Sequence, residues 1–202
     1  MSTLKTGALR GTSGTADSVQ LHASDQSVTF PGAVTVTGTL TNSGLPVAVK
    51  YAQFHDQKSA ETNAGTFTSG AWRDRDITTE VIDADNIASL SSNQITLVAG
   101  TYRIEAFVPG FNVNRHKAKL VQVSGSSFSD VIGTADYSHT SAPNQTFSKI
   151  FANLTLGAET VFKIQHQCQS TKTDDGFGIS NSYNFTDDTV EIYTVVRIWK
   201  IA

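Results

Sequence analysis

Cross-linking groups are nearly absent from this sequence, because Cys168 is its single cysteine. One thiol excludes an intrachain disulfide and a metal site built from clustered cysteines. No apolar run reaches the roughly 18 residues of a membrane-spanning helix, and the N-terminal MSTLKTGALRG lacks a continuous apolar segment. We therefore expect a soluble protein made in a cytoplasm, without signal peptide or membrane insertion, and held together by packing.

The sequence also lacks a large excess of either positive or negative charge. The 202 residues carry 15 Lys and Arg against 18 Asp and Glu, a net charge of −3, without long charged runs. A basic surface for nucleic acid or for an anionic membrane is therefore not expected. With 39% hydrophobic residues, the chain can bury one core and has room for a short accessory segment besides.

Helical periodicity is missing, and strand-forming residues dominate instead. In TYRIEAFV, residues 101–108, Tyr102, Ile104 and Ala106 alternate with Arg103 and Glu105, as in a half-buried strand. Further strands are predicted at 49–55, 76–82, 93–98, 117–123, 146–156, 160–168 and 190–201. So many short strands predict an all-β sandwich of the jelly-roll type.

The N-terminal part, residues 1–45, has few large apolar groups but one regular alternation, QSVTFPGAVTVTGTLTNSG at 26–44. Alone it cannot offset an ordering cost of roughly 1–2 kcal/mol per residue. Three copies wound about one axis would point the apolar residues of this stretch inward, namely Val28, Phe30, Val34, Val36 and Leu40. We predict an arm or stalk over 1–45 and a head over 46–202; a flexible linker is the other interpretation of the arm.

The last predicted strand is apolar on both faces. Its even positions include Val190, Ile192, Val196 and Ile198, and its odd positions Tyr193, Val195, Trp199 and Ile201. A sandwich covers one face of each sheet, so the second face predicts another subunit. The interface candidates on the odd face are Tyr193, Val195 and Trp199. The alternative is a core large enough to absorb both faces.

Longer stretches resemble known families. SVTFPGAVTVTGTLTNSG resembles the N-terminal segment of many bacteriophage fibre and virion-appendage proteins. GAWRDRDITTEV, ITLVAGTYRIEAFV and VEIYTVVRIWK are similar to the heads that such segments carry. Those heads resemble the complement-globular-head and tumour-necrosis-factor (TNF) superfamily. The resemblance implies an all-β homotrimer with an N-terminal extended β arm followed by a TNF-like jelly-roll sandwich. It also implies a place in the virion, with the arm attached to another virion protein of the tail or capsid.

Catalytic and metal chemistry find little support. His166 and Cys168 share a strand face with Phe162 and Ile164, which favours buried packing over a ligand or nucleophile pair. The aspartate pairs lack the spacing of a dedicated calcium loop. WRDRD, at 72–76, is interpreted as a surface ion-pair cluster that registers subunits. We assign no catalytic residue, metal or cofactor and expect no enzyme.

The segment TKTDDGFGISNSYNFTDD, 171–188, precedes the last strand and combines polar groups with aromatic rings. Such a loop suits contact with a host surface glycan or protein. The contact candidates are Asp174, Asp175, Phe177, Asn181, Tyr183 and Asn184. The alternative is that the aromatic rings pack the loop onto the head.

These observations predict a structural phage protein, a trimeric tail fibre or receptor-binding appendage that contacts the host surface. The alternative function is a capsid decoration or cement protein, in which the same trimer stabilises or projects from the shell. The two differ in the partner of the arm: a tail or adaptor protein in the first, the capsid in the second.

Overall fold

The computed structural model describes residues 49–180 and 189–202. They belong to the second of the two units into which the chain divides, Met1–Leu45 and Pro46–Ala202. The regular structure of this part consists of strands alone, and no helix that could cross a membrane is found in it. The predicted arm lies outside the described residues, and so do its interface candidates, Val28, Phe30, Val34, Val36 and Leu40.

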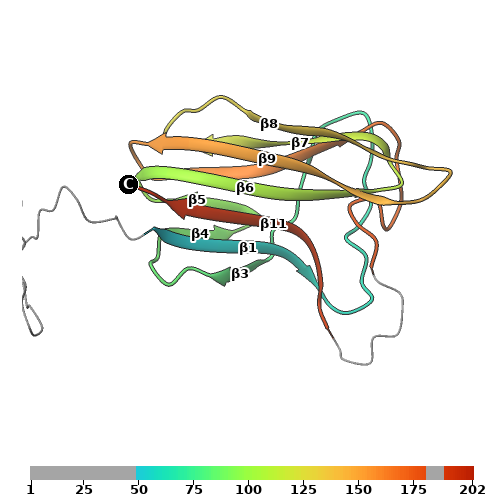
Figure 1. The fold of residues 1–202 in the computed structure, drawn as a ribbon, viewed down its shortest axis with the longest axis horizontal. Helices are drawn as coiled ribbons and strands as arrows, with labels where there is room; N and C mark the ends of the chain where they lie inside the picture. The colour runs from blue at the N-terminus through green and yellow to red at the C-terminus, as the bar shows by residue number, and fades with distance from the viewer. Residues whose placement is uncertain (1–48, 181–188) are drawn as a thin grey trace, which may run out of the picture. The chain divides into compact units, whose positions relative to one another are not determined.

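The strands form two antiparallel sheets (Figure 1). One sheet has five strands in the order β3-β1-β11-β6-β9. The other has the order β4-β5-β10-β7-β8, with β2 paired to β10. The bounds are β1 Lys50–Lys58, β2 Arg73–Asp74, β3 Thr79–Ile82, β4 Ala88–Ser91, β5 Gln94–Leu97, β6 Gly100–Phe111, β7 Asn114–Ser124, β8 Val131–Ser138, β9 Gln145–Leu156, β10 Thr160–Cys168 and β11 Glu191–Lys200.

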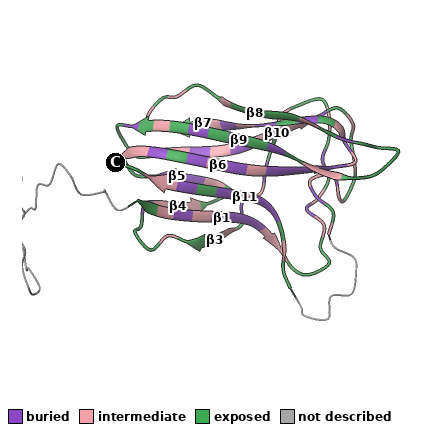
Figure 2. Ribbon diagram, in the orientation of Figure 1, coloured by how far each residue is buried: buried purple, intermediate pink, exposed green. Residues whose placement is uncertain are grey.

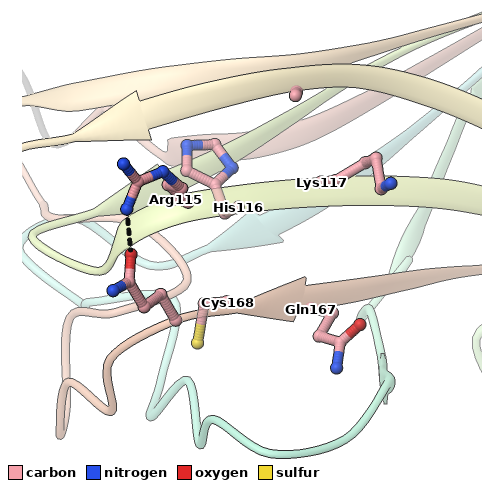
Figure 3. A pocket seen from close by; sticks show the side chains of 7 residues that line it. Arg115, His116, Lys117, Gln167 and Cys168 are labelled. Atoms are coloured by element: carbon pink, nitrogen blue, oxygen red, sulfur yellow. Dashed lines mark hydrogen bonds between the residues drawn. The ribbon is translucent and has the colours of Figure 1, made fainter.

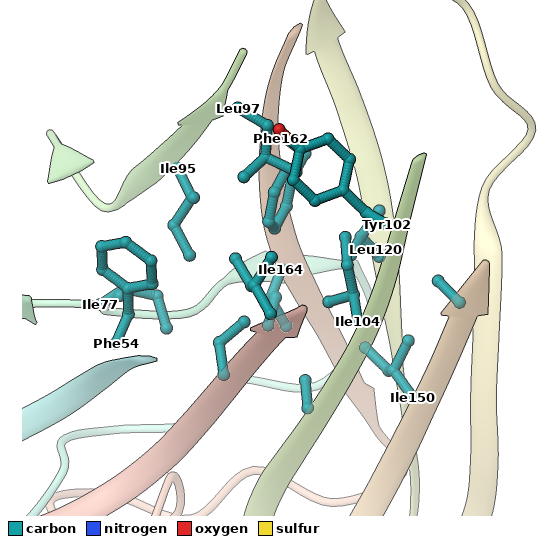
Figure 4. Close-up of a cluster of buried hydrophobic side chains, with 14 of the residues drawn as sticks. Phe54, Ile77, Ile95, Leu97, Tyr102, Ile104, Leu120, Ile150, Phe162 and Ile164 are labelled. Atoms are coloured by element: carbon teal, nitrogen blue, oxygen red, sulfur yellow. The ribbon is translucent and has the colours of Figure 1, made fainter. Parts of the chain in front are cut away.

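The prediction of an all-β jelly-roll sandwich is confirmed by this strand order, in which chain neighbours pass repeatedly from one sheet to the other. Buried and exposed residues alternate along the central strands (Figure 2). The alternation arises because successive side chains point to opposite faces of a strand. The core fills the space between the sheets (Figure 4), with Tyr102 and Ile104 from β6, Ile150 from β9, and Phe162 and Ile164 from β10.

Three strands were not predicted: β2, β4 and β8. The β8 sequence, VIGTADYS, has no clean two-residue alternation, and its pairing with β7 shifts register between Lys117 and Lys119. A register shift of this kind moves side chains to the other face, which removes the periodic signal. The strands with clear alternation, such as β6 and β10, were predicted close to their observed bounds.

The two ends of the sandwich differ. Lys50 at the start of β1 pairs with Lys200 at the end of β11, so the described chain enters and leaves the fold at one end (Figure 1). The opposite end, which we call the distal end, carries the loops 59–72, 139–144 and 169–180. The first part of the predicted contact loop therefore lies at the distal end.

Candidate functional site

One side of the five-stranded sheet faces away from the core. The registers of β1, β11, β6 and β9 align its side chains in rows, for example Tyr51 beside Trp199 and Trp199 beside Arg103. We call this surface the aromatic sheet face; it consists of Tyr51, Gln53, His55, Arg103, Glu105, Phe107, Phe147, Lys149, Phe151, Val195, Arg197 and Trp199.

Aromatic rings and cations contact each other across this face. The rings of Tyr51 and Trp199 lie 5.4 Å apart between centroids, tilted by 45°. The guanidinium carbon of Arg103 lies 5.8 Å from the Trp199 ring, and that of Arg197 lies 5.6 Å from the ring of Phe107. At these distances each guanidinium group is attracted to the electron-rich face of its ring, which adds to the packing of the face.

The aromatic sheet face is open to solvent in a single chain. Phe151 is 56% exposed and Phe147 36% exposed, while Val195 and Trp199 are half-buried. The core absorbs the other side of β11, where Val196 lies fully buried. The core thus covers one side of β11, while Val195 and Trp199 on its other side stay half-buried in a single chain.

Tyr193 does not reach the aromatic sheet face. Its side chain is 3% exposed, and its hydroxyl donates a hydrogen bond of 2.6 Å to the carbonyl oxygen of Thr62. Its ring also packs so closely on Gly178 that a Cβ there would lie 2.3 Å from the ring. Tyr193 therefore holds two distal loops of its own chain together.

Arg75 is buried, which corrects the interpretation of WRDRD as a surface cluster for this residue, whereas Asp74 and Asp76 do form surface ion pairs with Lys163 and Lys58. Its side chain is 1% exposed, and its Nε and Nη2 donate to Thr194 Oγ1 at 3.1 and 2.9 Å. Asp56, which is also buried, lies 3.9 Å from Nη2. Burial lowers the pKa of Arg75 to about 10 and raises the pKa of Asp56. The ion pair thus fastens the segment 59–78 to the interior of its own chain.

The distal loop packs its aromatic ring inward. Phe177 stacks on Phe67 with centroids 4.4 Å apart, and the guanidinium carbon of Arg75 lies 4.3 Å from its ring centre. The packing alternative therefore describes Phe177. Asp174 remains exposed and accepts a 2.6 Å hydrogen bond from Asn63 Nδ2. Asp175 is half-buried and pairs with Lys172, while Asn181, Tyr183 and Asn184 lie outside the described residues.

His166 and Cys168 are buried, as predicted. His166 Nε2 lies 2.9 Å from His116 Nδ1, and His116 Nε2 lies 2.8 Å from Thr146 Oγ1. Burial lowers the pKa of His116 to about 4 and raises that of the Cys168 thiol to about 11, so at neutral pH the imidazole is uncharged and the thiol stays protonated. Within 49–180 and 189–202, no three His, Cys, Asp or Glu side chains gather as a metal site would need.

No protein-family model matches the sequence, and no curated protein matches it. Among solved structures, the chain is similar to the globular domain of a zebrafish complement 1qA protein, with 12% identity and a TM-score of 0.48 over 76% of this chain and 97% of that one. It is also similar to murine APRIL, with 8% identity and a TM-score of 0.42 over 75% and 98%. The third is PRD1 vertex protein P5, with 14% identity and a TM-score of 0.44 over 76% and 97%. The jelly-roll assignment rests on the strand order of the two sheets.

Proposed function

We propose that the protein is a homotrimeric structural component of a bacteriophage virion, a tail fibre or receptor-binding appendage. The observation that carries the self-association is the open aromatic sheet face. Exposed clusters of large apolar side chains are uncommon on monomers and mark protein interfaces. Aromatic residues and arginine, which dominate this face, are also the residue types enriched at the centres of interfaces.

The apolar surface continues onto the edge strand β3. Val81 and Ile82 are each 47% exposed there, and Ile82 pairs directly with Gln53, so its side chain lies on the same side of the sheet as the aromatic sheet face. The proposal of a ring of three copies, in place of a two-fold dimer, is supported by the sequence resemblance to trimeric heads. In such a ring each copy packs this surface against a different patch of the next copy.

The placement in a virion is supported by the sequence resemblance to phage fibre segments and heads. In this proposal the arm, residues 1–45, docks a tail or adaptor protein, and the distal loops meet the host surface. The head acts by binding and not by catalysis.

Light scattering on the full-length protein tests the assembly. We expect a mass of about 65 kDa, three times the 21.6 kDa of one chain. Phe151→Asp places a charge in the aromatic sheet face and should give monomers. Ile132→Asp is the matched control, because Ile132 is 53% exposed on β8 of the other sheet and should leave the trimer intact. A monomeric native protein, or a trimeric Phe151→Asp variant, contradicts the proposal.

The virion placement has its own test. Antibodies against the protein, applied to particles of the phage that encodes it, should label the tail in electron micrographs. Label distributed over the shell would replace the fibre assignment by capsid decoration. Unlabelled particles that also lack the protein by mass spectrometry would remove it from the virion.

A further inference from the structure

The six-stranded sheet carries a hollow on its solvent side, on the opposite layer from the aromatic sheet face. It has a volume of about 340 Å³ and is lined by residues of β7, β8 and β10 and by the residue after β10 (Figure 3), namely Arg115, His116, Lys117, Ala135, Gln167, Cys168 and Gln169. A second hollow of about 510 Å³ shares Arg115 and Ala135 with the first and continues to Asp136 and Tyr137. Both hollows are shallow and open widely to solvent, so a ligand would lie on the sheet surface and not inside an enclosed cleft.

Strand register brings these side chains together. On β7, Arg115 and Lys117 are two residues apart and both point to solvent. Lys117 pairs with Gln167 on one side and with Ala135 on the other. Because Ala135 has a short side chain, the surface is lower there than at Tyr137, which pairs with Arg115. The hollow therefore has a cationic side, an amide side and an aromatic end.

The cations at the hollow are not neutralised within the described part of the chain. Lys117 makes no hydrogen bond or ion pair with any residue there, and the Gln167 side chain makes no hydrogen bond either. Arg115 donates to Gln169 Oε1 at 3.1 Å and lies 6.0 Å from the Tyr137 ring centre, so its neighbours are an amide and a ring.

The rest of the same face behaves differently. Lys119 pairs with Asp130 at 2.7 Å, and Lys163 pairs with Asp74 at 2.9 Å. No carboxylate lines the first hollow; in the second, an oxygen of Asp136 accepts the backbone N–H of Tyr137 at 2.7 Å. Arg115 and Lys117 thus place two cations without a carboxylate partner among the described residues at the first hollow, while the carboxylate of Asp136 lines the second hollow beside Arg115.

We propose that this hollow binds an acidic saccharide. Arg115 and Lys117 would donate hydrogen bonds to the carboxylate of the saccharide. Such charge-assisted hydrogen bonds are stronger than hydrogen bonds between neutral groups. The amides of Gln167 and Gln169 both donate and accept, as sugar hydroxyls require. Tyr137, 44% exposed at the end of the second hollow, offers a flat apolar surface to the C–H face of a sugar ring. All of these groups come from one chain, so the proposal does not rest on the trimer.

Isothermal titration calorimetry with trigalacturonic acid tests the site on the full-length protein, with neutral galactotriose as the uncharged counterpart. We expect the acidic trisaccharide to bind and the neutral one to bind at least about tenfold more weakly. Lys117→Gln and Arg115→Gln should each weaken binding of trigalacturonic acid by about tenfold. Lys163→Gln is the matched control, because it removes the same charge from the same sheet face where Asp74 already neutralises it.

Several outcomes overturn the proposal. It is wrong if trigalacturonic acid, triglucuronic acid and sialyllactose all fail to bind to a protein that light scattering and circular dichroism show to be assembled and folded. It is also wrong if Lys163→Gln weakens binding as much as Lys117→Gln does, since the effect then reflects overall charge. Equal affinity for a short polyglutamate would show an anion site without preference for sugars. Light scattering reports separately on the trimer.

Discussion

The guanidinium carbon of Arg75 lies 4.3 Å from the centre of the Phe177 ring, and the same side chain donates a 3.0 Å hydrogen bond to the Phe177 carbonyl oxygen. One residue between β2 and β3 thus holds the loop that follows β10. The buried guanidinium group of Arg75 thus connects the distal loop 169–180 to the interior of the head.

Replacing Arg75 with methionine tests this anchor. Arg75→Met leaves Asp56 buried with only Lys58, at 3.2 Å, as a cationic partner. We expect the free energy of unfolding to fall by about 3 kcal/mol, because breaking a buried pair strands a desolvated charge. Lys163→Met removes an ion pair whose partner Asp74 is 55% exposed and should cost less than about 1 kcal/mol. Urea denaturation measures both, and equal losses would argue against the anchor.

Gly178 tests the packing of the distal loop on Tyr193. Its φ is +153°, and an added Cβ would lie 2.3 Å from Tyr193 Cδ1. We expect Gly178→Ala to lower the free energy of unfolding by about 1–3 kcal/mol through overpacking. Gly157→Ala is the control, since its nearest contact would be Ser126 Oγ at 4.0 Å, and it should change stability by less than about 0.5 kcal/mol. A Gly178→Ala variant as stable as the control would contradict this packing.

The buried histidine pair predicts a loss of stability in mild acid. Burial lowers the pKa of His116 to about 4 and that of His166 well below 6.5, whereas both titrate near 6.5 when unfolded. Between pH 6.5 and 4 the unfolded chain therefore binds more protons than the folded one, and stability falls as the pH falls. For His116 the loss amounts to about 3 kcal/mol at pH 4.

Comparison with His116→Gln isolates this contribution, because glutamine keeps a donor and an acceptor at that position. The raised pKa of Asp56 acts in the opposite direction and is common to both proteins. We expect a flatter dependence of the urea midpoint on pH for the variant between pH 7 and 4. Parallel curves would show that His116 does not govern the acid response.

Tryptophan fluorescence can follow the proposed assembly. The chain has two tryptophans, Trp72 and Trp199, and the second lies on the aromatic sheet face. In a Trp72→Phe background, acrylamide should quench Trp199 weakly in the trimer and strongly once Phe151→Asp separates the subunits. The ring centre of Trp72 lies 4.6 Å from Nζ of Lys119, which belongs to the six-stranded sheet. In a Trp199→Phe background, acrylamide should therefore quench Trp72 equally in the trimer and in the separated subunits. Equal quenching of Trp199 in both states would place the interface elsewhere.

Local alternation was sufficient to predict the fold class. β6 and β10 alternate in sequence as they do in space, because each has one face on the core. In β8 the alternation is interrupted by the extra residue between Ile132 and Ala135, where its pairing with β7 shifts register. Val195 and Trp199 were predicted on the side of the last strand that faces away from the core, and they lie there. This could be predicted because alternate residues of a strand point to the same side.

Long-range pairing left no local signal. Arg75 follows a run of charges and reads as a surface residue, yet its partners are Asp56 and Thr194, the latter 119 residues away in sequence. Tyr193 shares parity with Val195, but a register shift of β11 between Ile192 and Val195 turns it inward, where it contacts Thr62 and Gly178. The cationic hollow was not predicted either, because three strands contribute to it and only their register shows that Lys117 and Gln167 adjoin.

The pairing of Lys50 with Lys200 also determines how the head bears tension. A pull applied between residues 49 and 202 would open the β1–β11 ladder one hydrogen bond at a time from its end, against little resistance. A pull between residue 49 and the distal loops runs along the strands instead and loads the hydrogen bonds of that ladder together in shear. A head held at residue 49 and gripped at its distal loops is therefore loaded in its mechanically strong direction.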